Sequence, residues 1–240
     1  WDHPNGDRFN NKPMVGEKGN VFAWLSFNKT YGKPFFVSEW DQPWADEWRA
    51  EHPLAMSAVA AFQGWNGLTV YTYRHSTGTP IDSLSGAFET FNDPTRFGLF
   101  YHAALIFRRG DVSKGKQTVA IYVPQDKVLS SPNPSAWQTQ ALLVSSEKHR
   151  IAMALSEVDA DMKPYDQPMI DQDATDITSD TNQLYRSWEK RIGTIDTPMT
   201  KAVYGFVGDA GSIQLDGLNL DVKTPFATIA LSSLTDEPIE

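Results

Sequence analysis

The sequence predicts an α/β part followed by a mainly β part, and three observations support this fold class. Segments of helical and strand character alternate over the first 110 residues, the order expected of parallel strands joined by helical crossovers. Short strand-like segments separated by Gly and Asp turns fill the second half, as in an antiparallel sheet or sandwich. The pattern of expected elements changes near residues 111–116, so we expect two domains, over residues 1–112 and 113–240.

The first half begins with two helix–strand pairs. Residues 19–31 carry a helix-like apolar face, and residues 34–38 form a short apolar strand. Residues 49–63 are rich in Ala at helical spacing, with Pro53 near the first turn, where proline is tolerated. Residues 68–73 are rich in Val, Thr and Tyr and are typical of a strand.

The clearest helix of the sequence covers residues 94–109. Asp93 is a natural N-cap, and Pro94 occupies the first helical position, where its missing N–H costs nothing. Arg108 and Arg109 complement the dipole at the C-terminal end. This helix closes the α/β part.

The second half is dominated by short strand signals. Residues 118–123 form a strand, residues 140–145 and 149–155 are ambiguous between strand and helix, and the Asp-rich residues 159–180 predict a loop. Further short strands are expected at residues 183–188, 193–197, 202–207, 212–215, 218–222 and 226–231. These closely spaced strands predict an antiparallel β-sandwich.

Composition limits the function classes. The chain has 240 residues, 40% apolar and 12% aromatic, enough for a sizeable core. Its net charge is −9 and no run of basic residues occurs, so nucleic acid and anionic membranes are poor partners. No apolar run approaches the ~18 residues of a membrane span. The absence of cysteine excludes disulfides, thiolate metal sites and cysteine catalysis.

We expect neither a metal nor a cofactor. Asp171, Asp173, Asp176 and Asp180 suggest calcium, but their spacing departs from the EF-hand pattern, with Asn182 where that pattern places its last glutamate. A solvated acidic loop is the better interpretation. The glycine-containing stretch GSIQLDGLNL lacks the strand and helix that flank a nucleotide-binding loop.

One apolar strand ends on a carboxylate surrounded by aromatic residues. In KPFFVSEW the strand runs into Glu39, with Trp40 beside it and Trp44 and Trp65 nearby in sequence. Catalytic groups of a parallel βα barrel sit at the C-terminal ends of strands. Sugars pack their C–H faces on aromatic rings, and a carboxylate among such rings suits the nucleophile of a retaining glycosidase. The alternative is a solvated or salt-bridged glutamate beside core tryptophans.

Three stretches carry a family resemblance: KPFFVSEW, AEHPLAMSAVAAFQGWNGLTVYTYRH and NDPTRFGLFYHAALIFRRGDV. They resemble the C-terminal half of the (β/α)8 glycoside hydrolases that use two glutamates, which include cellulase-like and β-galactosidase-like enzymes. The resemblance implies that Glu39 is the nucleophile at the end of strand seven. It also implies that residues 68–73 are strand eight and residues 94–109 the closing helix.

The resemblance extends to the substrate-binding residues and the β part. WDHP at the start resembles the end of strand six, where the clan often places a residue that contacts the substrate, here His3. Subsites for the sugar would be lined by Trp40, Trp44, Trp65, Tyr73 and His75. Residues 113–240 look like the accessory β-sandwich that some large members carry.

The sequence also departs from that family. The clan's general acid is a glutamate usually preceded by asparagine, and no Asn-Glu pair occurs here. Strands one to five have no counterpart, so we expect a partial barrel of about strands 6–8. Such a barrel has unpaired edges and an open interior face. We therefore expect a missing N-terminal half or self-association, and a chain that begins at Trp1 as a piece of something longer.

Two functions follow as hypotheses. The first is a glycoside hydrolase, as a fragment or subunit, that cleaves β-linked polysaccharide or oligosaccharide with retention, with the acid/base outside this chain. The second is a non-catalytic carbohydrate-binding or interaction module derived from such an enzyme. The substrate class suggests an extracellular or periplasmic location.

Overall fold

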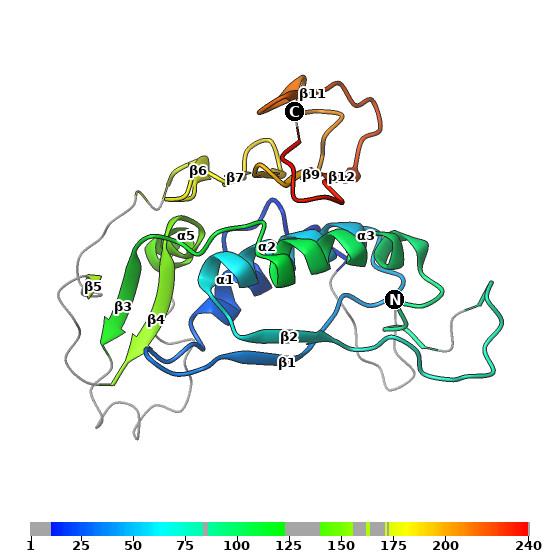
Figure 1. Ribbon diagram of the computed structural model, residues 1–240, viewed down its shortest axis with the longest axis horizontal. Helices are drawn as coiled ribbons and strands as arrows, with labels where there is room; N and C mark the ends of the chain where they lie inside the picture. The colour runs from blue at the N-terminus through cyan, green and yellow to red at the C-terminus, as the bar shows by residue number, and fades with distance from the viewer. Residues whose placement is uncertain are drawn as a thin grey trace.

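The computed structural model describes residues 11–83, 86–122, 140–155, 162–163, 171 and 173–239. The protein is a mixture of helix and sheet that includes an antiparallel sheet of five strands, as the sequence predicted in outline. Figure 1 shows the main helices in the middle of the molecule, with strands β1 and β2 on one side and the five-stranded sheet on the other. No helix in these ranges is long and apolar enough to cross a membrane.

Strands β1 (Phe36–Trp40) and β2 (Gly67–Val70) pair in parallel. The helix α2 (His52–Gln63) connects them, following a short 3-10 turn, η1 (Arg49–Glu51), and ending at Gly64 with φ 66°. A positive φ favours glycine, so this residue fixes the end of the helix. The expected strand–helix–strand order is confirmed.

Helix α3 (Pro94–Ala104) confirms the predicted cap, because the side chain of Asp93 accepts a hydrogen bond from the backbone N–H of Thr95. It continues as a π-helical turn, η2 (Leu105–Arg109). Helix α1 (Val21–Ser26) is shorter than expected, and its N-cap is Asn20, whose side chain accepts from the backbone N–H of Ala23.

A second parallel sheet occupies the start of the region expected to be all β. Its strands β3 (Thr118–Tyr122), β4 (Arg150–Ala154) and β5 (Met162–Lys163) lie in the order β4-β3-β5, and helix α5 (Gln140–Lys148) precedes β4. Residues 140–148 are thus helical and 150–154 extended. The buried side chain of Gln63 fixes this change by donating to the carbonyls of Ser146 and His149 and accepting from the N–H of Ile151.

The antiparallel sheet has the strand order β12-β9-β8-β7-β6. Its strands are β6 (Asp176–Thr178), β7 (Leu184–Ser187), β8 (Ile192–Asp196), β9 (Thr200–Gly205) and β12 (Ala227–Ser232). A separate hairpin of β10 (Ile213–Leu215) and β11 (Leu218–Leu220) packs its apolar side chains against this sheet. In the described part of the chain, helices and this hairpin cover the sheet where a sandwich would place a second large sheet.

The helical layer and the antiparallel sheet share one hydrophobic core. Trp40 and the buried face of α2 belong to the same cluster as Ile195 of β8 and Tyr204 of β9. The ring of Trp48 lies 5.1 Å from that of Phe206. Residues on the two sides of position 112 therefore pack as one body.

Candidate active site

The C-terminal ends of β1 and β2 meet at the same edge because the two strands are parallel. Trp40 is in register with Val70, and the backbone N–H of Tyr71 donates to the carbonyl of Trp40 at 3.0 Å. Glu39 therefore lies beside the segment that follows β2. The strand reaches two residues further than predicted, so Glu39 belongs to β1 itself.

Glu39 has an exposed side chain at this edge. The pairing of β1 with β2 is irregular between Val37 and Trp40, and both residues between them point away from the core. Within the described ranges, no hydrogen bond or ion pair engages the carboxylate of Glu39. It is therefore not committed to any cation of the described residues.

Three exposed aromatic side chains follow the two strand ends: Trp44 is 45% exposed, Tyr71 43% and Tyr73 56%. The segment 86–91 contacts the backbone of both stretches. Its Ala87 carbonyl accepts from the N–H of Trp44, and its Phe88 carbonyl accepts from the N–H of Thr72. Because Ala87 and Phe88 are neighbours, the loop after β1 and the segment after β2 lie side by side.

His75 belongs to the same edge. Its exposed imidazole lies edge-on to the ring of Tyr71, with 5.7 Å between the ring centres. It also rests on Gly86, where an added Cβ would come within 2.5 Å of the imidazole. A glycine at this position therefore lets His75 approach the aromatic cluster.

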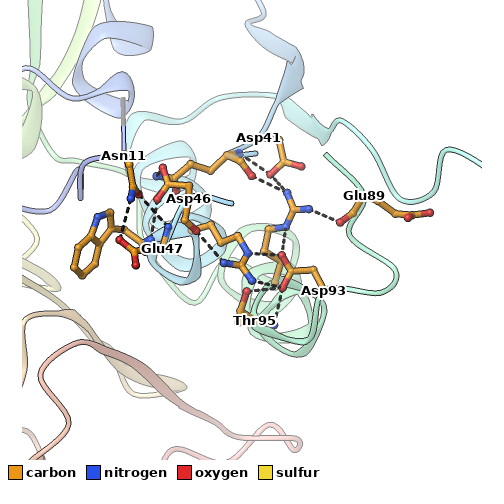
Figure 2. A network of polar contacts seen from close by, with 11 residues as sticks. Asn11, Asp41, Asp46, Glu47, Glu89, Asp93 and Thr95 are labelled. Atoms are coloured by element: carbon orange, nitrogen blue, oxygen red, sulfur yellow. Dashed lines mark hydrogen bonds and ion pairs between the residues drawn. The ribbon is translucent and has the colours of Figure 1, made fainter. Parts of the chain in front are cut away.

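A buried arginine fixes the loop that carries Trp44. The guanidinium of Arg96 forms ion pairs with Asp41 and Asp93 and donates to the carbonyl of Glu89. These three partners are labelled in Figure 2. Arg96 is fully buried, and it also donates to the carbonyl of Gln42 at 3.0 Å. Because these partners come from the loop after β1, the 86–91 segment and the start of α3, Arg96 holds all three together.

Arg49 extends this network to the aromatic edge. Its Nε lies 2.5 Å from Oδ2 of Asp93, and its Nη1 donates to the carbonyl of Asp46 at 2.9 Å. The same guanidinium stacks over the indole of Trp44 at 4.4 Å from the ring centre. A cation over an indole face holds the ring in place while leaving its other face open.

The two aspartates of the network differ in electrostatic environment. Burial raises the pKa of Asp41 to about 6, against the attraction of Arg96. Burial also acts to raise the pKa of Asp93, but hydrogen bonds from Arg49 and Thr95 outweigh it and lower the pKa overall. Asp41 is the carboxylate closest to Glu39 along the chain, and its ion pair with Arg96 commits it to the scaffold.

The remaining residues expected at the site lie elsewhere. Trp40 is buried and packs edge-on against His52, with ring centres 4.6 Å apart. Trp65 is buried against Phe35. Both indoles are core side chains in this structure and offer no open face to a sugar. His3 lies outside the described residues.

Of the residues expected from the sequence, Glu39, Trp44, Tyr73 and His75 are exposed and lie on β1 or on the segments that follow β1 and β2. The structure adds Tyr71, which the sequence analysis did not single out, although its position directly after a strand was a usable signal. No family model, curated protein or solved structure matches the chain. The functional interpretation therefore depends on the chemistry of these side chains.

Proposed function

We propose that this chain carries the nucleophile side of a retaining β-glycosidase site, with Glu39 as the nucleophile. One observation carries the proposal: an exposed carboxylate without a protein partner in the described structure stands at the C-terminal edge of a parallel strand pair, and exposed aromatic residues follow both strands. Tyr71, Tyr73 and Trp44 provide flat apolar faces for the C–H surfaces of a sugar. The substrate class is a β-linked polysaccharide or oligosaccharide.

In the proposed reaction, Glu39 attacks the anomeric carbon as the glycosidic bond breaks, and a covalent glycosyl-enzyme forms. Water then hydrolyses this ester. A second carboxyl group about 5–5.5 Å away is needed to protonate the leaving group and later activate water. Asp41 is held by Arg96, so we assign the acid/base to a partner outside this chain.

The partner follows from the proposed fold, in which β1, α2, β2 and α3 are the last units of a (β/α)8 barrel. Phe36 is 57% exposed on β1, and on a barrel strand such a side chain would face the interior. We propose that an N-terminal half or a second copy of the chain covers this face. Size-exclusion chromatography tests this directly, because a strictly monomeric chain contradicts it. A polymeric substrate would also favour a location outside the cell or in the periplasm.

Activated aryl β-glycosides test the nucleophile, because their good leaving groups need little acid assistance. Glu39→Gln should lower turnover by several powers of ten, since the covalent route is lost. The matched control is Glu189→Gln, the same change at an exposed glutamate in the turn between β7 and β8. Equal turnover by the wild type and Glu39→Gln would contradict the assignment.

Trapping identifies the nucleophile independently of rate. A 2-deoxy-2-fluoro glycoside with a good leaving group slows breakdown of the intermediate, and the added mass should lie on the peptide that contains Glu39. A label on another carboxylate would transfer the nucleophile role to that residue.

A non-catalytic carbohydrate-binding module is the second candidate. It is favoured by the commitment of Asp41 to Arg96, which leaves Glu39 without a free carboxylate close to it along the chain. This alternative predicts glycan binding that Trp44→Ala weakens and Glu39→Gln preserves, with no turnover of any aryl glycoside.

A further inference from the structure

A second polar cavity opens at the other end of the same strands. It has a volume of about 170 Å3 and is lined by residues that precede β1 and β2 and by residues that begin β3 and β4. Lys33 and Asn66 precede β1 and β2, and Thr118 and Arg150 are the first residues of β3 and β4. The cavity therefore lies where the N-terminal ends of the two parallel sheets meet, away from Glu39.

Basic side chains from separate segments converge on this cavity. Lys29, Lys33 and Arg150 line it. Lys114 is close by, because its Cδ and the Nζ of Lys29 would lie 3.4 and 3.5 Å from a Cβ added at Gly64. No carboxylate lines the cavity within the described residues. This concentration of positive charge is unusual in a chain whose net charge is −9.

The cations of the cavity are not neutralised by the protein where it is described. Lys29 donates to the carbonyls of Gln63 and Gly64 at the C-terminal end of α2, at 2.9 and 2.8 Å. These carbonyls are neutral acceptors with a partial negative charge. The Nε of Arg150 is buried and has no hydrogen-bond partner among the described residues.

Burial and repulsion by neighbouring cations act together on the pKa of Lys29. Burial, followed by the charges of Arg150 and Lys114, lowers the pKa of Lys29 to about 8. The negative charge of a bound anion would offset the repulsion from Arg150 and Lys114 and favour the charged ammonium group.

We propose that this cavity binds a tetrahedral oxyanion, a phosphate or sulfate group, either free or carried on a ligand. Arginine and lysine together suit such a group, since guanidinium N–H groups donate in a fixed fork and ammonium groups add charge. The side-chain oxygen of Asn66 already accepts from the N–H of Phe35, which leaves its amide N–H2 to donate. The volume exceeds the ~30 Å3 of one water molecule several times, so the anion fits with part of its hydration shell.

Calorimetric titration with inorganic phosphate and with sulfate, against chloride at equal ionic strength, tests the site. The wild type should show saturable binding, and Arg150→Gln should weaken it at least about tenfold, the usual order for a lost charged hydrogen bond. Arg108→Gln is the matched control, because Arg108 is exposed in η2 and does not line the cavity. Lys33→Ala, a change at an exposed residue, gives a second weakened variant should Arg150→Gln not fold.

A sugar phosphate separates the two sources of the anion. Binding of inorganic phosphate that is lost in Arg150→Gln supports a free ion, and binding of glucose 6-phosphate alone, lost in the same variant, supports an anion carried on a ligand. No saturable binding of any of these probes overturns the proposal, as does binding that Arg150→Gln and Arg108→Gln weaken equally. Glu39→Gln should bind phosphate like the wild type. The test of the anion site is therefore independent of the test of the proposed glycosidase activity.

Discussion

The two ends of the β1–β2 pair differ in the sign of the charge that is left without an ion-pair partner in the described structure. At the C-terminal ends, the buried cation Arg96 is neutralised by Asp41 and Asp93, and the carboxylate of Glu39 is left without a partner in the described structure. At the N-terminal ends, Lys33 and Arg150 line the cavity, and neither forms an ion pair with a described residue. Paired charges thus fix the loops, and unpaired charges of opposite sign mark the two proposed ligand sites.

Removing the buried cation should have the largest effect. Arg96→Met leaves Asp41 and Asp93 buried without their shared partner, and loss of one member of a buried ion pair costs about 3–5 kcal/mol of unfolding free energy. Denaturant unfolding measures this, with Arg108→Met as the exposed control, expected within about 0.5 kcal/mol of the wild type. A variant as stable as the control would mean that Arg96 does not organise the site.

Titration of Glu51 should give the next largest effect. Its carboxylate accepts from the N–H groups of Met14 and Val15, yet burial raises its pKa from 4.5 to about 7. The folded state therefore binds the proton more tightly than the unfolded state. Its contribution to stability is present below pH 4.5 and is lost as pH rises through 7, by about 3 kcal/mol in total.

Unfolding of the wild type and Glu51→Gln, measured from pH 5 to pH 8, isolates this contribution. The glutamine keeps one acceptor oxygen and cannot titrate, so the advantage of the wild type over the variant should shrink as pH rises. A difference that stays constant across this range would show that Glu51 does not titrate there.

Trp44 distinguishes binding from stability at the carboxylate end. Because its indole is exposed and stacked on one face by Arg49, Trp44→Ala should lower kcat/KM or glycan affinity by roughly tenfold and change the unfolding free energy by less than about 1 kcal/mol. Trp24→Ala removes an indole that is 42% exposed on α1 and should leave sugar binding unchanged. Equal effects of the two substitutions would remove Trp44 from the proposed subsite.

A pair of glycine substitutions gives the smallest effects. Gly86→Ala places a methyl group against His75 and should move this exposed ring away from Tyr71, with a small loss of sugar affinity. Gly98→Ala lies in α3 with no atom within 4 Å of the added carbon, and it should stabilise the protein by about 0.5–1 kcal/mol. Affinity lost in Gly98→Ala and kept in Gly86→Ala would contradict the placement of His75.

Local signals predicted the elements that depend on local interactions. The cap at Asp93 and the end of α2 at Gly64 lie in short stretches of sequence, so helices α2 and α3 were recognisable. Residues 140–145 and 149–155 were ambiguous. Part of what separates the helix from the strand here is the side chain of Gln63, which bonds to this region from more than 80 positions away.

The candidate site, like the helices, was predictable where it depends on residues that are close in the sequence. The strand ending near Glu39 and the exposed aromatic residues after it are patterns that the sequence shows directly. Burial of Trp40 and Trp65 depends on packing against α2 and Phe35, which no local pattern records. No local pattern predicted the cavity lined by basic side chains, because Lys29, Lys114 and Arg150 are far apart in the sequence and adjacent only in the fold.

The packing of the Trp48 indole bears on whether this protein can be divided into separately expressed parts. The indole packs against the rings of Phe206 and Phe226, with ring centres 5.1 and 4.9 Å away, although more than 150 residues separate it from either. Cutting the chain near position 112 would remove the residues that cover this indole. Both pieces would then expose an apolar surface that is prone to aggregation. Expression trials should therefore keep the two halves in one polypeptide or produce them together.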